Sequence, residues 1–152
     1  MKKLIDLYPY RIEENGVSFL LLKRSADKIY SGQWRMIGGK VRKGETRWET
    51  ALRELYEETG LTPELFWTVP TLNHFYEASE DQIHLIPAFA AQIRPDSEVI
   101  LDEEHKTSKW IASGEIKNCI FWPEQKRIIE CISTIVQTNR ILKDWIIKLD
   151  HT

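Results

Sequence analysis

The sequence lacks the features of secreted and membrane-spanning proteins. Its 152 residues include two cysteines, Cys119 and Cys131, too few for a disulfide framework, and both lie in apolar surroundings. No apolar run approaches the roughly 20 residues needed to cross a bilayer. Asp6 interrupts the basic N-terminus before the apolar region of a secretion signal can form. We therefore expect reduced thiols, no membrane association and a cytoplasmic protein.

The chain as a whole also has little excess of charge of either sign. There are 21 Lys and Arg against 23 Asp and Glu, a net charge of −2 that disfavours bulk electrostatic binding to nucleic acid or an anionic membrane. The four histidines show no zinc-ligand spacing with one another or with the cysteines. The distribution is uneven, however. Residues 23–53 carry nine Lys and Arg against three Asp and Glu, a charge of +6 that leaves −8 elsewhere. Such a cluster suits a small polyanionic ligand.

The hydrophobic pattern predicts a single domain over residues 1–152 that mixes strands and helices. Apolar runs predict strands, with Pro87 at a bulge or edge of one of them, at residues 7–12, 17–22, 36–39, 71–76, 82–93, 99–101 and 107–111. Pro123 begins a predicted helix, and residues 141–149 form a last amphipathic segment. These elements indicate an α/β or α+β layered fold whose extra C-terminal helices cover the core or form a homodimer surface.

The clearest predicted element is a helix over residues 47–59. Thr46 is a favourable N-cap, Glu49 three residues later completes a capping box, and Gly60 suits a left-handed C-terminal cap. The expected core face of this helix consists of apolar residues at helical spacing, namely Trp48, Ala51, Leu52 and Leu55.

Three glutamates share the opposite face of this predicted helix. Glu54, Glu57 and Glu58 are spaced i, i+3 and i+4, so their carboxylates crowd together and repel one another. A solvated acidic face is the ordinary interpretation of such a pattern. The pair Gly38-Gly39 before the helix favours a metal site instead, because glycines let backbone atoms approach a ligand closely. Oxygen ligands without Cys or His indicate Mg²⁺ or Mn²⁺.

These residues belong to a longer pattern that resembles the Nudix box. Gly39 is followed by five residues, Glu45, seven residues and then Arg-Glu-Leu-Tyr-Glu-Glu-Thr-Gly-Leu over residues 53–61, and every defined position of the box is matched. The resemblance implies the family's α/β/α sandwich around a mixed sheet. It also implies hydrolysis of a nucleoside diphosphate linked to another group, with bound Mg²⁺ or Mn²⁺.

The resemblance further implies roles for individual residues of the box. Arg53 is expected to pair with Glu45 and so to hold the glutamates in place. Glu54 is expected to be either a metal ligand or the base that activates water. The complete set of implied metal ligands within this region is the Gly38 carbonyl with Glu54, Glu57 and Glu58.

A shorter segment outside the box carries a second resemblance. Glu104-His105, followed by Trp110, resembles the corresponding region of dihydroneopterin triphosphate pyrophosphatases, which also act on dATP and other nucleoside triphosphates. The family usually takes one more acidic residue from outside the box. Glu104 is the candidate for that catalytic or metal-binding role, and Glu103 is the alternative.

Substrate contacts are predicted from charge and aromatic character. Arg24, at the end of an apolar strand, is the best single candidate for a phosphate contact, and Arg35 and Lys40 lie in the same basic segment. A base or pterin needs a stacking platform, for which the candidates are Trp34, Tyr30, Phe75 and Tyr76.

The expected function is Mg²⁺- or Mn²⁺-dependent cleavage of a nucleoside triphosphate, or of dihydroneopterin triphosphate, to the monophosphate and pyrophosphate. A nucleotide sugar, a dinucleoside polyphosphate or an oxidised nucleotide is an alternative substrate for the same chemistry. A non-catalytic nucleotide-binding regulator is a third interpretation. It is disfavoured because such members commonly lose box residues, all of which are present here.

Overall fold

A computed structural model of the chain describes residues 2–24 and 33–149, except for the side chain of Lys106. Tyr30, one of the predicted stacking residues, lies outside the described residues. Within the described ranges, no helix is both long and apolar enough to span a bilayer. Cys119 and Cys131 are free thiols, as predicted, and both pack against the hydrophobic core.

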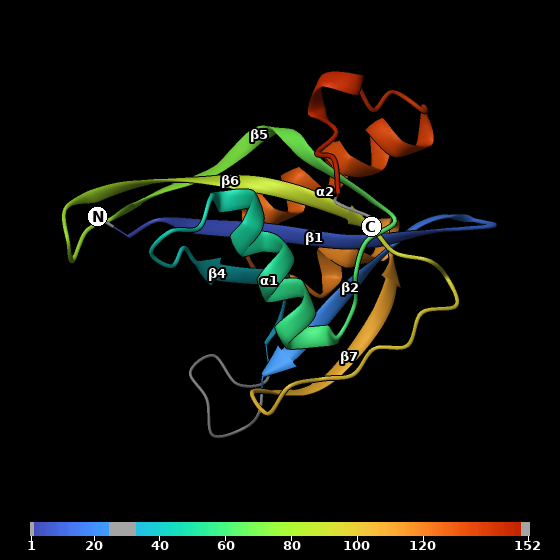
Figure 1. The fold of residues 1–152 in the computed structure, drawn as a ribbon, viewed down its shortest axis with the longest axis horizontal. Coiled ribbons are helices and arrows are strands. Elements are labelled where there is room, and N and C mark those ends of the chain that lie inside the picture. The colour runs from blue at the N-terminus through green and yellow to red at the C-terminus, as the bar shows by residue number, and fades with distance from the viewer. Residues whose placement is uncertain (1, 25–32, 150–152) are drawn as a thin grey trace.

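A mixed seven-stranded sheet forms the centre of the molecule (Figure 1). Strand β1 (Leu4–Glu13) runs parallel to β6 (Gln82–Gln92) along one side. Along its other side, β1 pairs antiparallel with β4 (Ile37–Lys40) through its first half and with β2 (Gly16–Arg24) through its second half. The predicted strands at residues 7–12, 17–22 and 36–39 are therefore confirmed within longer or slightly shifted elements.

The remaining strands widen the sheet on both sides. β5 (Leu65–Glu77) forms the predicted hairpin with β6. β3 (Trp34–Arg35) and β7 (His105–Ala112) both pair antiparallel with β2. The sequence predicts an irregularity at Pro87 of β6. The register between β5 and β6 does shift there, but the extra residues lie in β5, just before Leu72, which pairs with Pro87.

Helices cover both faces of the sheet, which gives the expected α/β/α layers (Figure 1). α1 (Arg47–Thr59) lies on one face and α2 (Pro123–Gln137) on the other. A 3₁₀ helix (Ser113–Asn118) links β7 to α2. Pro123 occupies the first turn of α2, where its missing N–H leaves no helical hydrogen bond unmade.

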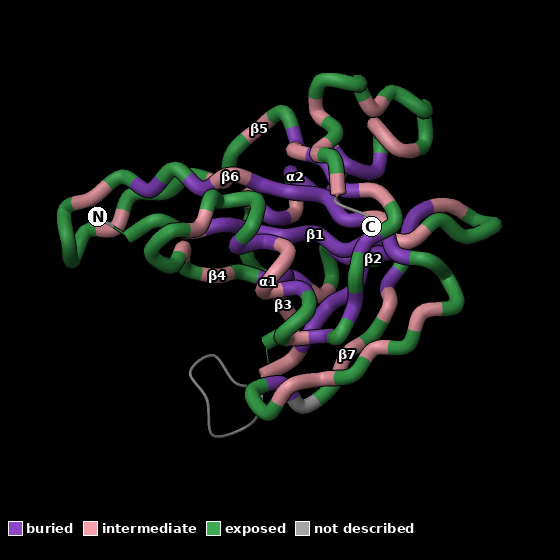
Figure 2. Tube along the Cα trace, in the orientation of Figure 1, coloured by how far each residue is buried: buried purple, intermediate pink, exposed green. Residues whose placement is uncertain are grey.

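Each face of the sheet has its own hydrophobic core, and Figure 2 shows the central strands as buried along most of their length. On the α1 side, Ile5 and Leu7 of β1 pack with Leu55 of the helix. On the α2 side, Tyr10 packs with Trp67, whose Nε1 donates to the Tyr10 hydroxyl at 2.9 Å. Both faces are apolar because successive side chains of a strand point to opposite sides.

Two predictions about the α1 region are wrong. Trp48 does not belong to the core face, since 38% of it is exposed, and Thr50 and Thr59 are buried instead. Residues 99–101 form no strand, because the backbone N–H of Ile100 donates to the carbonyl of Thr59 at the end of α1. That segment is thus attached to a helix terminus rather than to the sheet.

The C-terminal segment also differs from its prediction. Residues 141–149 are mostly irregular and contain one short 3₁₀ turn, Lys143–Trp145, so α2 is the one long helix after β7 among the described residues. Trp145 stacks on Trp67 with ring centroids 6.3 Å apart, and the N–H of Ile147 donates to Phe66 of β5. Contacts with the sheet, rather than helical hydrogen bonds, therefore hold this segment in place.

Candidate metal centre

The caps of α1 determine where its glutamates lie. Thr46 Oγ1 accepts from the N–H of Glu49 at 3.3 Å, and the Glu49 carboxylate accepts from the N–H of Thr46 at 2.9 Å. Gly60 has φ 72°, and its N–H donates to the carbonyl of Tyr56 at 2.8 Å. The predicted capping box, the left-handed cap and both ends of the helix are confirmed.

Arg53 connects the glutamates of α1 to the loop that precedes the helix. Its guanidinium donates to both carboxylate oxygens of Glu45, at 2.6 and 2.9 Å, and to the carbonyl of Lys40 at 3.2 Å. It also donates to Glu54 at 2.8 Å and to Glu57 at 3.3 Å. The hydrogen bonds from Arg53 lower the pKa of Glu45 to about 2. The predicted Arg53–Glu45 pair is therefore present.

Glu58 is a nearly buried carboxyl group among other carboxyl groups. Its side chain is 12% exposed, compared with 46% for Glu57. Burial, together with the negative charges of Glu54, Asp102 and Glu104, raises the pKa of Glu58 to about 9. Its Oε2 atom is buried without a hydrogen-bond partner. Burying such an oxygen costs free energy unless a hydrogen-bond donor or a cation binds it. These residues therefore fit a divalent cation.

The glycine pair of β4 lies close to two carboxyl groups, Gly39 to that of Glu54 and Gly38 to that of Asp6. A Cβ on Gly39 would lie 2.5 Å from Glu54 Cγ, so glycine alone leaves room for that side chain. A Cβ on Gly38 would lie 3.9 Å from Oδ1 of Asp6. Gly39 therefore packs closely against Glu54, whereas the role of the Gly38 carbonyl as a metal ligand stays a prediction.

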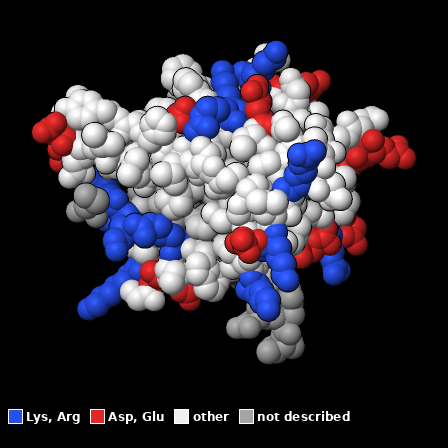
Figure 3. Space-filling model, turned by 90° about the horizontal axis from the view of Figure 1, so that it is seen from above, with Lys and Arg blue, Asp and Glu red and all other residues white. Residues whose placement is uncertain are grey.

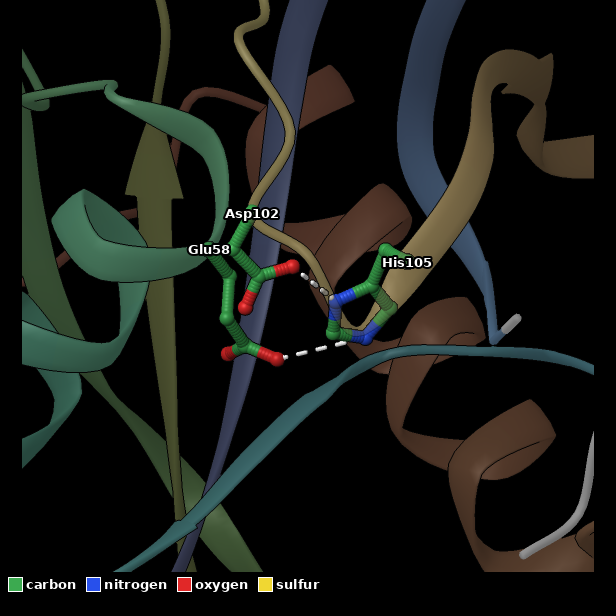
Figure 4. Close-up of side chains that lie close together, drawn as sticks. All are labelled: Glu58, Asp102 and His105. Carbon is green, nitrogen blue, oxygen red and sulfur yellow. Dashed lines mark hydrogen bonds and ion pairs between the residues drawn. The ribbon is translucent and has the colours of Figure 1, made fainter. Parts of the chain in front are cut away.

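The structure brings Asp102 and His105, from the segment before and at the start of β7, beside Glu58 (Figure 4). Asp102 Oδ1 lies 2.6 Å from His105 Nδ1, and Glu58 Oε1 lies 3.4 Å from Nε2. Sequence reasoning chose Glu104, with Glu103 as the alternative. Both are exposed, and the negative charge of Glu104 contributes to the raised pKa of Glu58. The i, i+3 spacing of Asp102 and His105 is the signal that could have indicated their pairing.

The structure places the predicted substrate-binding cations in different settings. Arg24 ends β2 and pairs in register with His105 of β7, which places it beside the metal centre. Lys40 is exposed at the end of β4. Arg35 lies close enough to Asp6 for its positive charge to lower the pKa of that carboxyl group.

The predicted stacking residues that the structure describes already make other contacts. Lys109 Nζ lies 4.3 Å from the ring centroid of Trp34. Phe75 stacks on His84 with ring centroids 4.8 Å apart, and the hydroxyl of Tyr76 donates to the hairpin turn at 2.8 Å. These contacts leave the predicted stacking role of the three residues as a prediction.

A buried polar cluster on the α2 side was missed by sequence reasoning. Asp6 accepts a hydrogen bond from Asn73 Nδ2 at 2.8 Å, and Tyr8 and Gln125 are further hydrogen-bonding neighbours. Burial raises the pKa of Asp6 to about 6 in spite of these bonds. Gln125 Oε1 is buried without a hydrogen-bond partner. The members come from β1, β5 and α2, so no local pattern indicates the cluster.

Comparison with known proteins agrees with the fold and with the carboxylate motif. The NUDIX domain profile matches residues 9–130. Nucleoside triphosphatase NudI of Enterobacter sp. (strain 638) is 28% identical over 108 residues, which cover 66% of this chain and 76% of that protein. An Ap4A hydrolase of C. elegans has the same fold, with a TM-score of 0.74 at 22% identity over 91% of this chain and 99% of that one.

A third similar protein is the NUDIX domain of NrtR from Shewanella oneidensis, whose structure was determined with ADP ribose. It has a TM-score of 0.70 at 18% identity over 88% of this chain and 86% of that one. The family profile spans most of the chain, and the glutamates of the box lie on the predicted helix, α1, or in the loop before it. The chain therefore belongs to the Nudix family of pyrophosphohydrolases.

Proposed function

We propose that the chain cleaves a nucleoside triphosphate, or dihydroneopterin triphosphate, to the monophosphate and pyrophosphate with a bound divalent cation. The observation that carries the proposal is the carboxylate cluster of α1. There Glu58 Oε2 is buried without a partner, and Arg53 holds Glu54 and Glu57 beside it. The similarity to a protein named nucleoside triphosphatase supports a triphosphate substrate.

The residues of the centre divide into those that bind the cation and those that position them. Arg53 and Glu45 orient the carboxylates. Glu54 is a metal ligand or the base, and Glu104 is a further metal ligand or the alternative base. A bound Mg²⁺ or Mn²⁺ neutralises charge on the phosphates and lowers the pKa of the attacking water. The proposed metal ligands from the box are the Gly38 carbonyl, Glu54, Glu57 and Glu58.

The polyphosphate of the substrate would lie beside this centre. Arg24 and Lys40 are the cations proposed to contact the polyphosphate, because they end the strands that border the carboxylate cluster. Trp34, Phe75 and Tyr76 stay the proposed candidates for contact with the base or pterin, because an aromatic ring offers a stacking surface to a heterocycle.

A substrate panel tests this proposal. The panel contains the nucleoside triphosphates, dihydroneopterin triphosphate, nucleotide sugars and dinucleoside polyphosphates, each with Mg²⁺, with Mn²⁺ and with EDTA. We expect one triphosphate to yield its monophosphate and pyrophosphate in the presence of metal, with no turnover in EDTA. Faster hydrolysis of a dinucleoside polyphosphate or a nucleotide sugar would change the substrate class. Tight binding without turnover would indicate a nucleotide-binding regulator.

A further inference from the structure

His105 has the surroundings of a metal-binding histidine that a carboxylate holds in place. Its side chain is 3% exposed, and its Nδ1 lies 2.6 Å from Asp102 Oδ1. Histidines that bind a metal through one ring nitrogen almost always use the other nitrogen to donate to a carboxylate or a carbonyl. With Nδ1 directed at Asp102, the Nε2 atom of His105 is the one that faces Glu58 (Figure 4).

The distance between His105 and Glu58 fits two ligands of one cation better than a hydrogen bond. Nε2 and Glu58 Oε1 are 3.4 Å apart, whereas strong N–H···O bonds measure about 2.7–3.2 Å. Two atoms that each lie about 2 Å from a cation are roughly 3 to 3.5 Å apart at octahedral or tetrahedral angles. The second oxygen of the same carboxylate, Glu58 Oε2, is the buried atom without a partner. Candidate ligand atoms of Glu58, Asp102 and His105 all lie within 4.8 Å of one another.

The fold holds these groups together from two sides. The N–H of Ile100 donates to the Thr59 carbonyl at 2.8 Å, and the N–H of Asp102 donates to the Glu58 carbonyl at 3.3 Å. His105 is the first residue of β7, where it pairs with the last residue of β2. The loop is therefore anchored both to the end of α1 and to the sheet, so the approach of His105 to Glu58 results from the fold.

We infer that His105 Nε2 binds a divalent cation together with the Glu58 carboxylate, and that Asp102 orients the imidazole for this contact. The site then has a mixed nitrogen and oxygen ligand set, whereas the box alone supplies oxygen. An imidazole ligand favours transition-metal ions over Mg²⁺. The inference rests on the proposed metal-dependent function and adds to it a ligand and a preference for Mn²⁺ or Co²⁺ over Mg²⁺.

Electron spin echo envelope modulation of the Mn²⁺-loaded full chain tests the ligand directly. We expect a ¹⁴N coupling in the wild type and its loss in His105→Gln. Titration of free Mn²⁺ by EPR should show affinity about 10- to 100-fold weaker in this variant, with a smaller loss for Mg²⁺ in competition. A wild-type spectrum without ¹⁴N coupling, or a coupling that persists in His105→Gln, would overturn the inference.

Two further variants separate ligation from structural effects. His84 is a second buried histidine beside a carboxylate, 3.1 Å from Glu77, and His84→Gln should leave the coupling and the affinity unchanged. Asp102→Asn should keep the coupling while weakening Mn²⁺ binding about 10-fold, and it serves as the test if His105→Gln does not fold. Loss of the coupling in His84→Gln would overturn the assignment to His105.

Turnover of the same Mn²⁺-loaded samples distinguishes this inference from the function on which it rests. Hydrolysis without a ¹⁴N coupling overturns the histidine ligand and leaves the proposed function intact. A ¹⁴N coupling that His105→Gln removes, in a protein without turnover on any substrate, supports the ligand and overturns the function.

Discussion

Arg53 shows how single side chains position the metal centre. It makes hydrogen bonds to the carboxylates of Glu45, Glu54 and Glu57 and to one carbonyl. A planar guanidinium can reach several acceptors at once from a fixed orientation, whereas the ammonium of lysine is a point charge on a flexible chain. The orientation of the carboxylates therefore depends on the shape of the Arg53 side chain as well as on its charge.

We accordingly expect Arg53→Lys to lower kcat about 10- to 100-fold while the protein stays folded. Steady-state kinetics with thermal melts measure both effects. Arg94→Lys is the matched control, because Arg94 is exposed and lies 3.5 Å from a single carboxylate away from the centre. Equal kcat values for Arg53→Lys and the wild type would show that a positive charge alone is sufficient to orient the carboxylates.

Asp6 predicts a pH dependence of folding stability. Its pKa is raised from 3.8 to about 6 by burial, so the folded protein binds this proton more tightly than the unfolded chain does. The stability that Asp6 contributes is complete below about pH 4 and declines as the pH rises to about 6. Above that pH the carboxyl is charged in both states, and the contribution is lost.

We expect Asp6→Asn to become progressively more stable relative to the wild type between pH 4 and 7, by roughly 1 to 3 kcal/mol. Urea unfolding at a series of pH values measures this difference. Asp96→Asn, which changes an exposed acid, should show no such trend. A difference between Asp6→Asn and the wild type that stays constant with pH would mean that the Asp6 carboxyl titrates alike in both states.

At the scale of elements, the close contact between β4 and α1 is the feature most sensitive to substitution. Gly39→Ala would place a Cβ 2.5 Å from Glu54 Cγ, so the glutamate must move out of the cluster. We expect at least about a 10-fold loss of kcat/KM with a modest loss of stability. Gly114→Ala is the control, because a Cβ at that position meets no atom within 4 Å. Comparable activity in both variants would contradict the packing described here.

Sequence reasoning predicted the elements whose signals are local. The ends of α1 follow from Thr46 and Glu49, which are three residues apart, and the glutamate face follows from helical spacing. The Asp6 cluster could not be predicted in this way, because its partner Asn73 is 67 residues away. The contact of His105 with Glu58 likewise depends on how a loop without strand structure docks on the end of α1. Non-local contacts of this kind need the assembled fold.

At the scale of the whole molecule, the charges of both signs are spread over the surface. Figure 3 shows Lys and Arg interspersed with Asp and Glu around a largely uncharged centre on one face. Along the sequence the charge is less even, since residues 23–53 carry +6 and the rest of the chain −8. That neither nucleic acid nor an anionic membrane is a bulk partner stays a prediction.

A bound cation should stabilise the whole molecule, since it binds the folded cluster and has no such site in the unfolded chain. At 100 times its dissociation constant the gain is about 2.7 kcal/mol, which corresponds to a rise in Tm of roughly 5 to 10 °C for a chain of this size. Differential scanning calorimetry in Mn²⁺ and in EDTA measures the rise. It should be largely lost in Glu58→Gln and kept in Glu130→Gln, an exposed glutamate of α2. An equal rise in both variants would place the cation elsewhere.

The central claim is that the carboxylates of α1 support metal-dependent cleavage of a phosphoanhydride bond. The most direct test is the rate of pyrophosphate release from the best triphosphate of the panel, measured for the wild type, Glu57→Gln and Glu130→Gln with saturating Mg²⁺ or Mn²⁺. The account predicts a loss of about 100-fold or more in Glu57→Gln and none in Glu130→Gln. Pyrophosphate release that is unaffected by Glu57→Gln would contradict it.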